Sequence, residues 1–122
     1  MADLSAPEKV LVRELSELIK EGRACILAVV RQELLSGIKT SEQFETLRIT
    51  LRSFPDEPLD PADYEAAARA SNVCRSKGVA VPVVDALICA VGTTRDWSIF
   101  TTDPDFGNYA TFLPIRLHIP RK

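Results

Sequence analysis

The sequence predicts an α/β fold in which helices cover a mainly parallel sheet. Segments with apolar residues at helical spacing alternate with short segments that are apolar throughout. The short segments have no polar face, which is typical of strands buried on both sides in a parallel sheet. The alternation is clearest at residues 82–106, where a buried helix, a turn and a buried strand lead into an acidic loop. At 122 residues the chain is long enough for one domain, which we expect to span residues 1–122.

The first half of the chain is predicted to form three helices and one short strand. Residues 5–8, Ser-Ala-Pro-Glu, have the form of a capping box, and the apolar stripe that follows closes at Gly22. Residues 25–27 are expected to form a buried strand, after which a helix runs over residues 29–37. A second capping box at residues 40–43 begins a helix that ends before the next proline.

The second half of the chain is predicted to contain the central helix and the strongest strand. An N-cap aspartate and a first-turn proline at residues 60–61 begin a helix that ends at Gly78. Pro82 opens the central helix, Gly92 closes it, and residues 97–102 form the strand. The two other expected strands are a brief edge strand at residues 57–59 and a final strand at residues 115–119. The buried side of the helix after residue 60 is expected to carry Tyr64, Ala67, Ala68, Ser71 and Cys74.

Composition and charge exclude several classes of function. Apolar residues make up 46% of the chain and charged residues 26%, and the net charge of −2 argues against an extended polyanion-binding surface. Neither common glycine-rich phosphate loop is present, and the single histidine, His118, lies on the last predicted strand, where we expect an edge role. Cys25, Cys74 and Cys89 lie in apolar patterns without metal-ligand spacing, so we expect reduced thiols. Without a signal peptide or a membrane-spanning run, the sequence predicts a cytoplasmic protein.

The remaining chemistry lies in carboxylates at the ends of the predicted strands. Glu33 comes just after the first strand, Asp85 lies in the first turn of the central helix, and Asp103 and Asp105 follow the next strand. In an open parallel sheet these positions converge on one rim. Clustered carboxylates repel one another unless a cation neutralises them, so the pattern predicts a Mg²⁺ or Mn²⁺ site.

Each of these acids also has a purely structural interpretation. Asp85 is favoured at the positive end of its helix, and Asp103 before a proline is a typical N-cap. Glu33 suits a solvated helix surface, and Asp105 suits the first turn of a helix. The structural interpretation is weakest for Asp85, because apolar residues surround it in the sequence.

The sequence resembles the PIN domain family, and within it the VapC-type ribonuclease toxins of bacterial toxin–antitoxin pairs. The matching segments are Gln-Glu-Leu-Leu-Ser-Gly at 32–37, Lys-Gly at 77–78, Val-Asp-Ala-Leu-Ile-Cys-Ala at 84–90 and Thr-Thr-Asp-Pro-Asp-Phe at 101–106. Their order and spacing fit from about residue 11 to residue 117. The resemblance implies a three-layer α/β/α sandwich and a divalent-metal nuclease that cleaves RNA and pairs with an antitoxin. It also implies that Glu33, Asp85 and Asp103 are the catalytic metal-site acids, with Asp105 as a secondary member.

The N-terminus departs from the family pattern. The family begins with a hydrophobic strand that ends in an aspartate and lies mid-sheet, whereas this sequence begins at the first helix. The expected fold is therefore a PIN-like sandwich that lacks the usual first strand. Three explanations stay open: a start site assigned too late, a decayed copy, or a strand supplied by a partner chain. Loss of the strand would remove a metal ligand and expose two strand edges, so we expect weak activity and a homodimer.

The predicted function is that of a toxin-type endoribonuclease that hydrolyses RNA phosphodiester bonds and is impaired by the missing strand. No side chain is an obvious general base, so the sequence assigns the activation of water to the cation. Backbone phosphates have candidate partners in Arg31, Lys39, Arg75 and Lys77. The alternative is a non-catalytic PIN-like protein that binds an antitoxin or RNA.

Overall fold

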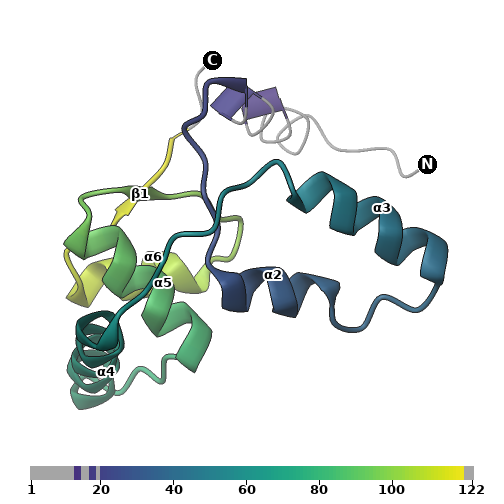
Figure 1. The fold of residues 1–122 in the computed structure, drawn as a ribbon. Coiled ribbons are helices and arrows are strands. Elements are labelled where there is room, and N and C mark those ends of the chain that lie inside the picture. Colours follow the sequence, from purple (N-terminus) through teal and green to yellow (C-terminus); the bar gives the residue numbers. More distant parts are fainter. Residues whose placement is uncertain (1–12, 15–16, 19, 120–122) are drawn as a thin grey trace. The chain divides into compact units, whose positions relative to one another are not determined.

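The computed structural model describes residues 13–14, 17–18 and 20–119, which belong to two compact units. The N-terminal unit ends at Pro58, and the C-terminal unit is Leu59–Ile119 (Figure 1). The capping box predicted at residues 5–8 lies outside the described residues. No helix among the described residues is long and apolar enough to cross a membrane.

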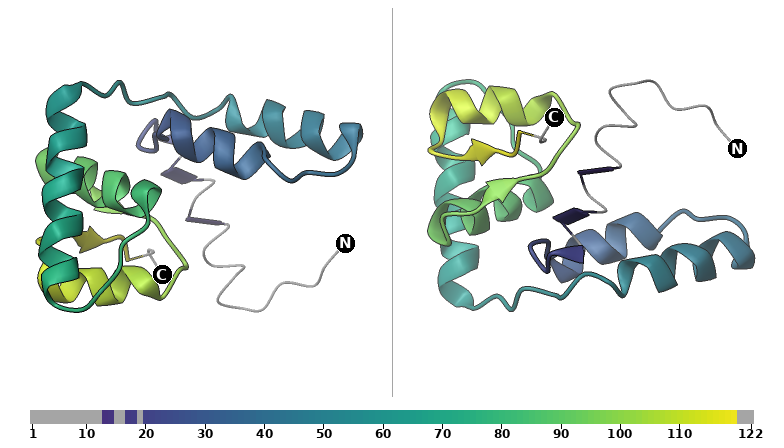
Figure 2. Two further views of the ribbon diagram at one scale, coloured as in Figure 1. Left: turned by 90° about the horizontal axis from the view of Figure 1, so that it is seen from below. Right: turned by 90° about the horizontal axis from the view of Figure 1, so that it is seen from above.

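The N-terminal unit contains α2 (Ala28–Leu35) and α3 (Ser41–Leu51), which lie side by side (Figure 2). Thr40 caps α3 as predicted, because its hydroxyl oxygen accepts a hydrogen bond of 3.1 Å from the Gln43 backbone N–H. Arg31 of α2 donates hydrogen bonds of 2.9 and 3.0 Å to the backbone carbonyls of Leu51 and Phe54. The guanidinium therefore adds hydrogen bonds to carbonyls at the end of α3 and just after it, where intrahelical donors are few.

The strands predicted in this part of the chain are largely wrong. Residues 25–27 contribute only one parallel bridge, between Ile26 and Asp56, and Cys25 is exposed instead of buried. The Ile26 N–H donates to the Pro55 carbonyl at 3.0 Å, and the Glu57 N–H donates to the Ile26 carbonyl at 3.0 Å. The pairing segment is thus shifted toward Asp56 from the predicted edge strand at residues 57–59.

The C-terminal unit alternates helices with two short parallel strands. In chain order its elements are α4 (Pro61–Ser76), α5 (Val83–Thr94), β1 (Ser98–Ile99), α6 (Asp105–Phe112) and β2 (Arg116–Leu117). Ser98 pairs with Arg116 and Ile99 with Leu117, and the His118 N–H extends the pairing to the Ile99 carbonyl at 2.8 Å. The predicted α/β class with a parallel sheet is confirmed, although both strands are shorter than the predicted 97–102 and 115–119.

Helix α4 packs along α5, while α6 contacts both α4 and β2. The core of the unit consists of Cys74, Cys89, Ile99, Phe106, Tyr109 and Leu113. The buried side of α4 is rotated from the prediction, because Asp63, Ala67 and Cys74 are buried whereas Tyr64 and Ala68 are exposed. The predicted face is thus correct for Ala67 and Cys74 and wrong for Tyr64 and Ala68, because a buried position of the helix holds a charged side chain.

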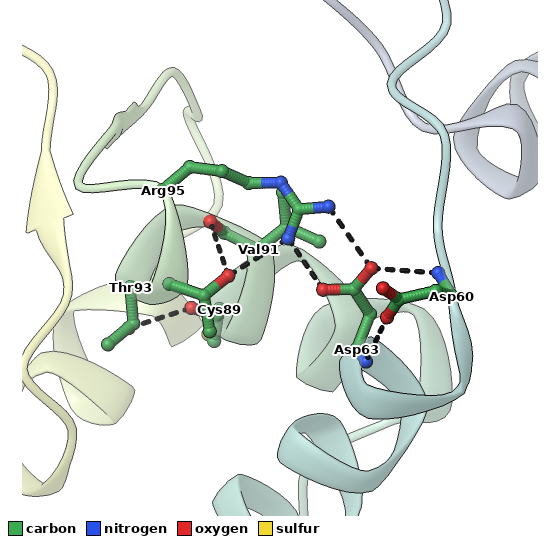
Figure 3. Close-up of polar contacts among 7 residues, drawn as sticks. Asp60, Asp63, Cys89, Val91, Thr93 and Arg95 are labelled. Carbon is green, nitrogen blue, oxygen red and sulfur yellow. Dashed lines mark hydrogen bonds and ion pairs between the residues drawn. The ribbon is translucent and has the colours of Figure 1, made fainter.

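That charge, the Asp63 carboxylate, is satisfied by Arg95 at the end of α5 (Figure 3). Arg95 Nη1 lies 2.6 Å from Asp63 Oδ1, and Nη2 lies 3.1 Å from Oδ2. Asp63 also completes a capping box with Asp60, in which each backbone N–H donates to the other side chain. The hydrogen bonds from Arg95, followed by that from the Asp60 backbone, lower the pKa of Asp63 from 3.8 to about 2.

Gly92 does not close the central helix, because α5 continues to Thr94. A Cβ atom at this position would lie 3.1 Å from Ile99 Cγ1 and 3.3 Å from the Trp97 carbonyl oxygen. The glycine therefore allows β1 to pack closely against the helix. This close contact holds β1 against α5, and the acidic segment follows directly after β1.

Candidate metal centre

Asp85 lies in the first turn of α5, where the predicted central helix placed it. Its neighbours Ala86 and Leu87 are buried, whereas Asp85 itself is half-buried. The Tyr109 hydroxyl of α6 donates a hydrogen bond of 2.8 Å to Asp85 Oδ2. A carboxylate at this position is stabilised by the positive end of the helix as well as by the hydroxyl.

Asp103 and Asp105 lie at the start of α6, in a segment shaped by side-chain hydrogen bonds. The Asp103 backbone N–H donates to Thr101 Oγ1 at 3.0 Å, and the Asp105 N–H donates to Asp103 Oδ1 at 2.9 Å. The N-cap role that the structural interpretation gave to Asp103 is wrong, because Pro104 is the residue that precedes the helix and no side chain of the described residues caps it. Asp105 is the acid of the first turn, as predicted. The hydrogen bond from the Asp105 N–H uses one Asp103 oxygen, and both aspartates are exposed.

Helix α6, which only the structural interpretation of Asp103 and Asp105 implied, carries Tyr109, and the hydroxyl of this residue contacts Asp85. Burial raises the pKa of Tyr109, its hydrogen bond to Asp85 raises it further, and the charges of Asp85, Asp105 and Asp103 add to the effect. The Tyr109–Asp85 hydrogen bond thus connects the start of α5 with α6, the helix whose first turn carries Asp105.

Glu33 lies in α2, in the N-terminal unit, where its side chain is exposed. Its convergence with the three aspartates stays a prediction. Among the described residues, no three acidic, histidine or cysteine side chains form a group that holds a metal ion. The available donors are carboxylate oxygens, and these fit the preference of Mg²⁺ and Mn²⁺ for hard oxygen ligands.

The basic residues considered for phosphate contacts differ in their availability. Arg31 is engaged within its own unit, because its guanidinium pairs with Asp56 at 2.7 Å in addition to the two backbone carbonyls. Arg75 hydrogen-bonds to Asn72 and Ser71 on its own helix and stays exposed. Lys39 and Lys77 are also exposed. Arg31 is consequently a structural residue, and the other three remain candidates for contact with a polyanion.

Tyr109 is the site residue that the sequence analysis missed. Its ring is 2% exposed and meets Phe106 edge-to-face, with 5.1 Å between the ring centroids. The signal lay in the spacing, since Asp105 and Tyr109 are one helical turn apart and therefore share a face of α6. Phe106, Tyr109 and Leu113 form the apolar side of the same segment, which a search for helical periodicity would have found.

Comparison with known proteins supports the resemblance drawn from the motifs. The PIN domain family model matches residues 5–111, which include α2 to α5, β1 and most of α6. No curated protein matches the chain. A helix-rich α/β structure with a small parallel sheet is consistent with the α/β/α fold of that family. The match covers most of the sequence, and the chain belongs to the PIN domain family.

Proposed function

We propose that the protein is a divalent-metal-dependent endoribonuclease of the toxin type, with Glu33, Asp85 and Asp103 as its metal-site acids. PIN domains are generally nucleases that use divalent metal ions, so the family supports phosphodiester hydrolysis as the reaction. The observation that carries the assignment of Asp85 is its hydrogen bond of 2.8 Å from the Tyr109 hydroxyl of α6, the helix whose first turn carries Asp105 and which Asp103 precedes. Carboxylates gathered in this way on an apolar frame are stabilised by a cation.

The protein's own residues prepare the site in three ways. The first turn of α5 and the Tyr109 hydroxyl stabilise the charge of Asp85, whose second oxygen is left for a ligand. The hydrogen bonds at Thr101 and Asp103 shape the segment that carries Asp103 and Asp105. Third, the exposure of Asp103 and Asp105 leaves this side of the site accessible to a polymer. A divalent cation, when bound, lowers the pKa of water and offsets negative charge on a phosphate.

The proposed substrate is single-stranded or looped RNA, and the proposed partners are a cognate antitoxin and a second copy of the chain. PIN domain proteins commonly bind RNA and often bind antitoxins, which supports the first two. Exposed Arg75 and Lys77 at the end of α4 supply positive charge for the RNA backbone. We assign the protein to the cytoplasm, where cysteines stay reduced, and Cys25, Cys74 and Cys89 take part in no disulfide.

Cleavage of RNA by purified protein tests the proposed function. A fluorescently labelled RNA oligonucleotide with a single-stranded loop is incubated with wild type, Asp85→Asn and Asp103→Asn in Mg²⁺, in Mn²⁺ and with EDTA. We expect metal-dependent cleavage by wild type and a loss of at least about 100-fold in each variant, because each loses a charged oxygen ligand. Light scattering of the same samples reports whether the chain is a homodimer.

Asp96→Asn is the matched control for the two aspartate variants. Asp96 is highly exposed and pairs with Arg116 at 3.2 Å, and its φ of +57° is a conformation that asparagine tolerates. The control should cleave RNA at the wild-type rate. Cleavage that survives EDTA or is equal in Asp85→Asn would contradict the proposal. RNA binding without cleavage by folded wild type would instead assign the protein to the non-catalytic alternative.

A further inference from the structure

We propose that Tyr109 is a positioning residue of the metal site, which holds Asp85 in the orientation that binds the cation. The inference rests on the proposed function, because Asp85 is the residue through which Tyr109 acts. It assigns a role to a buried side chain that the family motifs in this sequence do not include. The role is separate from direct metal binding, since a protonated phenol donates a hydrogen bond and Asp85 supplies the charged oxygen.

The contact between Tyr109 and Asp85 is short and specific. The hydroxyl lies 2.8 Å from Asp85 Oδ2, and within the C-terminal unit the structure shows no other hydrogen bond to this carboxylate. One donor on one oxygen fixes the rotation of the carboxylate and leaves Oδ1 for a ligand. Without this donor, the half-buried Asp85 side chain would be free to rotate toward solvent. Binding of a cation would then have to restrict that rotation, which costs conformational entropy and lowers the affinity.

The tyrosine is itself held rigidly, which a positioning role requires. Its ring is packed in the core against Phe106, and Phe106 is 4% exposed. Both rings belong to α6, whose first turn carries Asp105 and whose start follows Asp103. The same helix therefore connects Asp85 of α5 to the two aspartates that follow β1. A change in the Tyr109 hydroxyl alters the relation between these carboxylates without removing any of them.

Hydrogen bonds to metal-ligating carboxylates typically contribute 10–100-fold to metal affinity or activity. We therefore expect Tyr109→Phe, which removes one oxygen atom from a packed ring, to weaken Mn²⁺ binding by about tenfold or more. Tyr64→Phe is the matched control. Tyr64 is the only other tyrosine of the chain, it lies on α4 in the same unit, and 55% of its surface is exposed.

The test is a calorimetric titration with Mn²⁺ of wild type, Tyr109→Phe, Tyr64→Phe, Asp85→Asn and the double variant Tyr109→Phe/Asp85→Asn. Far-ultraviolet circular dichroism and thermal melting establish that each variant is folded at the titration temperature. If Tyr109 acts through Asp85, its substitution weakens binding in the wild-type background and adds nothing in the Asp85→Asn background. A purely structural role would weaken binding by the same factor in both backgrounds.

A spectroscopic measurement supplies a second readout. Occupation of the site changes the field at the Tyr109 hydroxyl, so Mn²⁺ should perturb the near-ultraviolet tyrosine absorption of wild type and Tyr64→Phe, and this signal should vanish in Tyr109→Phe. Unchanged Mn²⁺ affinity in Tyr109→Phe, alongside a loss in Asp85→Asn, would overturn the positioning role and leave the proposed function standing. Failure of wild type to bind Mn²⁺ would overturn both. If Tyr109→Phe does not fold, loss of the tyrosine signal in Asp85→Asn decides the matter, and a persistent signal refutes the coupling.

Discussion

The ion pair between Arg95 and Asp63 makes a quantitative prediction about the frame that carries Asp85. Replacement of Arg95 by methionine keeps much of the apolar stem but removes both hydrogen bonds to Asp63, at 2.6 and 3.1 Å. Because these bonds are the largest cause of the low pKa of Asp63, about 2 against an ordinary 3.8, the pKa should rise by about 1 pH unit or more. The backbone N–H of Asp60 still donates to the Asp63 carboxylate, so part of the lowering of its pKa should persist.

The sign of the effect on stability follows from proton linkage. The pKa of Asp63 is lower in the folded than in the unfolded state, so the unfolded chain binds more protons between about pH 4 and pH 2. The stabilisation by this group is therefore complete above about pH 4 and is lost as the pH falls toward 2. In Arg95→Met the melting temperature at pH 7 should be lower, and its decline between pH 4 and pH 2 should be shallower.

Two measurements check this prediction. Carbon-detected NMR of the aspartate carboxyl groups gives the pKa of Asp63 directly, and thermal melts between pH 7 and pH 2 give the stability profile. Arg116→Met is the control, because Arg116 pairs with an Asp96 side chain that is 89% exposed, and such surface pairs contribute little. An Asp63 that titrates near 4 in wild type, or whose pKa does not respond to Arg95→Met, would refute the reasoning.

Three further substitutions have predictable outcomes. Asp85→Asn should leave the metal-free melting temperature unchanged or slightly raised. The substitution relieves repulsion among the carboxylates, and the amide oxygen still accepts a hydrogen bond from Tyr109. A clear fall in melting temperature would make Asp85 a structural residue. Gly92→Val should lower the free energy of unfolding by about 2 kcal/mol, because even a Cβ atom at this position would lie 3.1 Å from Ile99 Cγ1. Urea denaturation measures this change, and an unaltered midpoint of the urea transition would contradict the close packing. Arg31→Lys keeps the charge but loses the planar guanidinium, so it should lower the free energy of unfolding by about 1–2 kcal/mol without weakening RNA binding. Weaker RNA binding with unchanged stability would instead make Arg31 a phosphate-contacting residue.

Local capping signals predicted the helices well. The N-cap aspartate and first-turn proline at Asp60 and Pro61 begin α4, and Thr40 caps α3, because in each case the preference arises from a hydrogen bond inside the segment itself. The run of apolar residues around Asp85 likewise predicted α5. These features depend on neighbours in the sequence and are therefore visible without tertiary structure.

Features that depend on distant partners were predicted poorly. The strands were expected to be longer because their segments are apolar, but ladder hydrogen bonds need a partner, and β1 pairs with β2 over only two residues. Helix α6 was implied only by the structural interpretation of Asp103 and Asp105, because Gly107 and Asn108 lower its intrinsic helix propensity. Packing of Phe106 and Tyr109 into the core overrides that preference.

The candidate site was predicted in part for the same reason. The sequence predicted that Asp85, Asp103 and Asp105 lie near one another; Asp85 meets the Tyr109 hydroxyl of α6, and the convergence of the three acids on a cation stays a prediction. It did not reveal Tyr109, since nothing in its immediate neighbours distinguishes this ring from an ordinary core aromatic. It also assigned Arg31 to RNA, although a distant aspartate and two carbonyls engage that side chain.

The central proposal is that Glu33, Asp85, Asp103 and Asp105 bind one divalent cation. Paramagnetic broadening by Mn²⁺ in the ¹H–¹⁵N NMR spectrum of the uniformly labelled chain tests it most directly, because the effect falls off steeply with distance from the ion. At substoichiometric Mn²⁺ the amide signals of residues 33, 85, 103 and 105 should broaden first and together, and Asp85→Asn should abolish the pattern. Broadening that spares Glu33 or Asp85, or that begins at surface acids such as Asp96, would contradict the shared site.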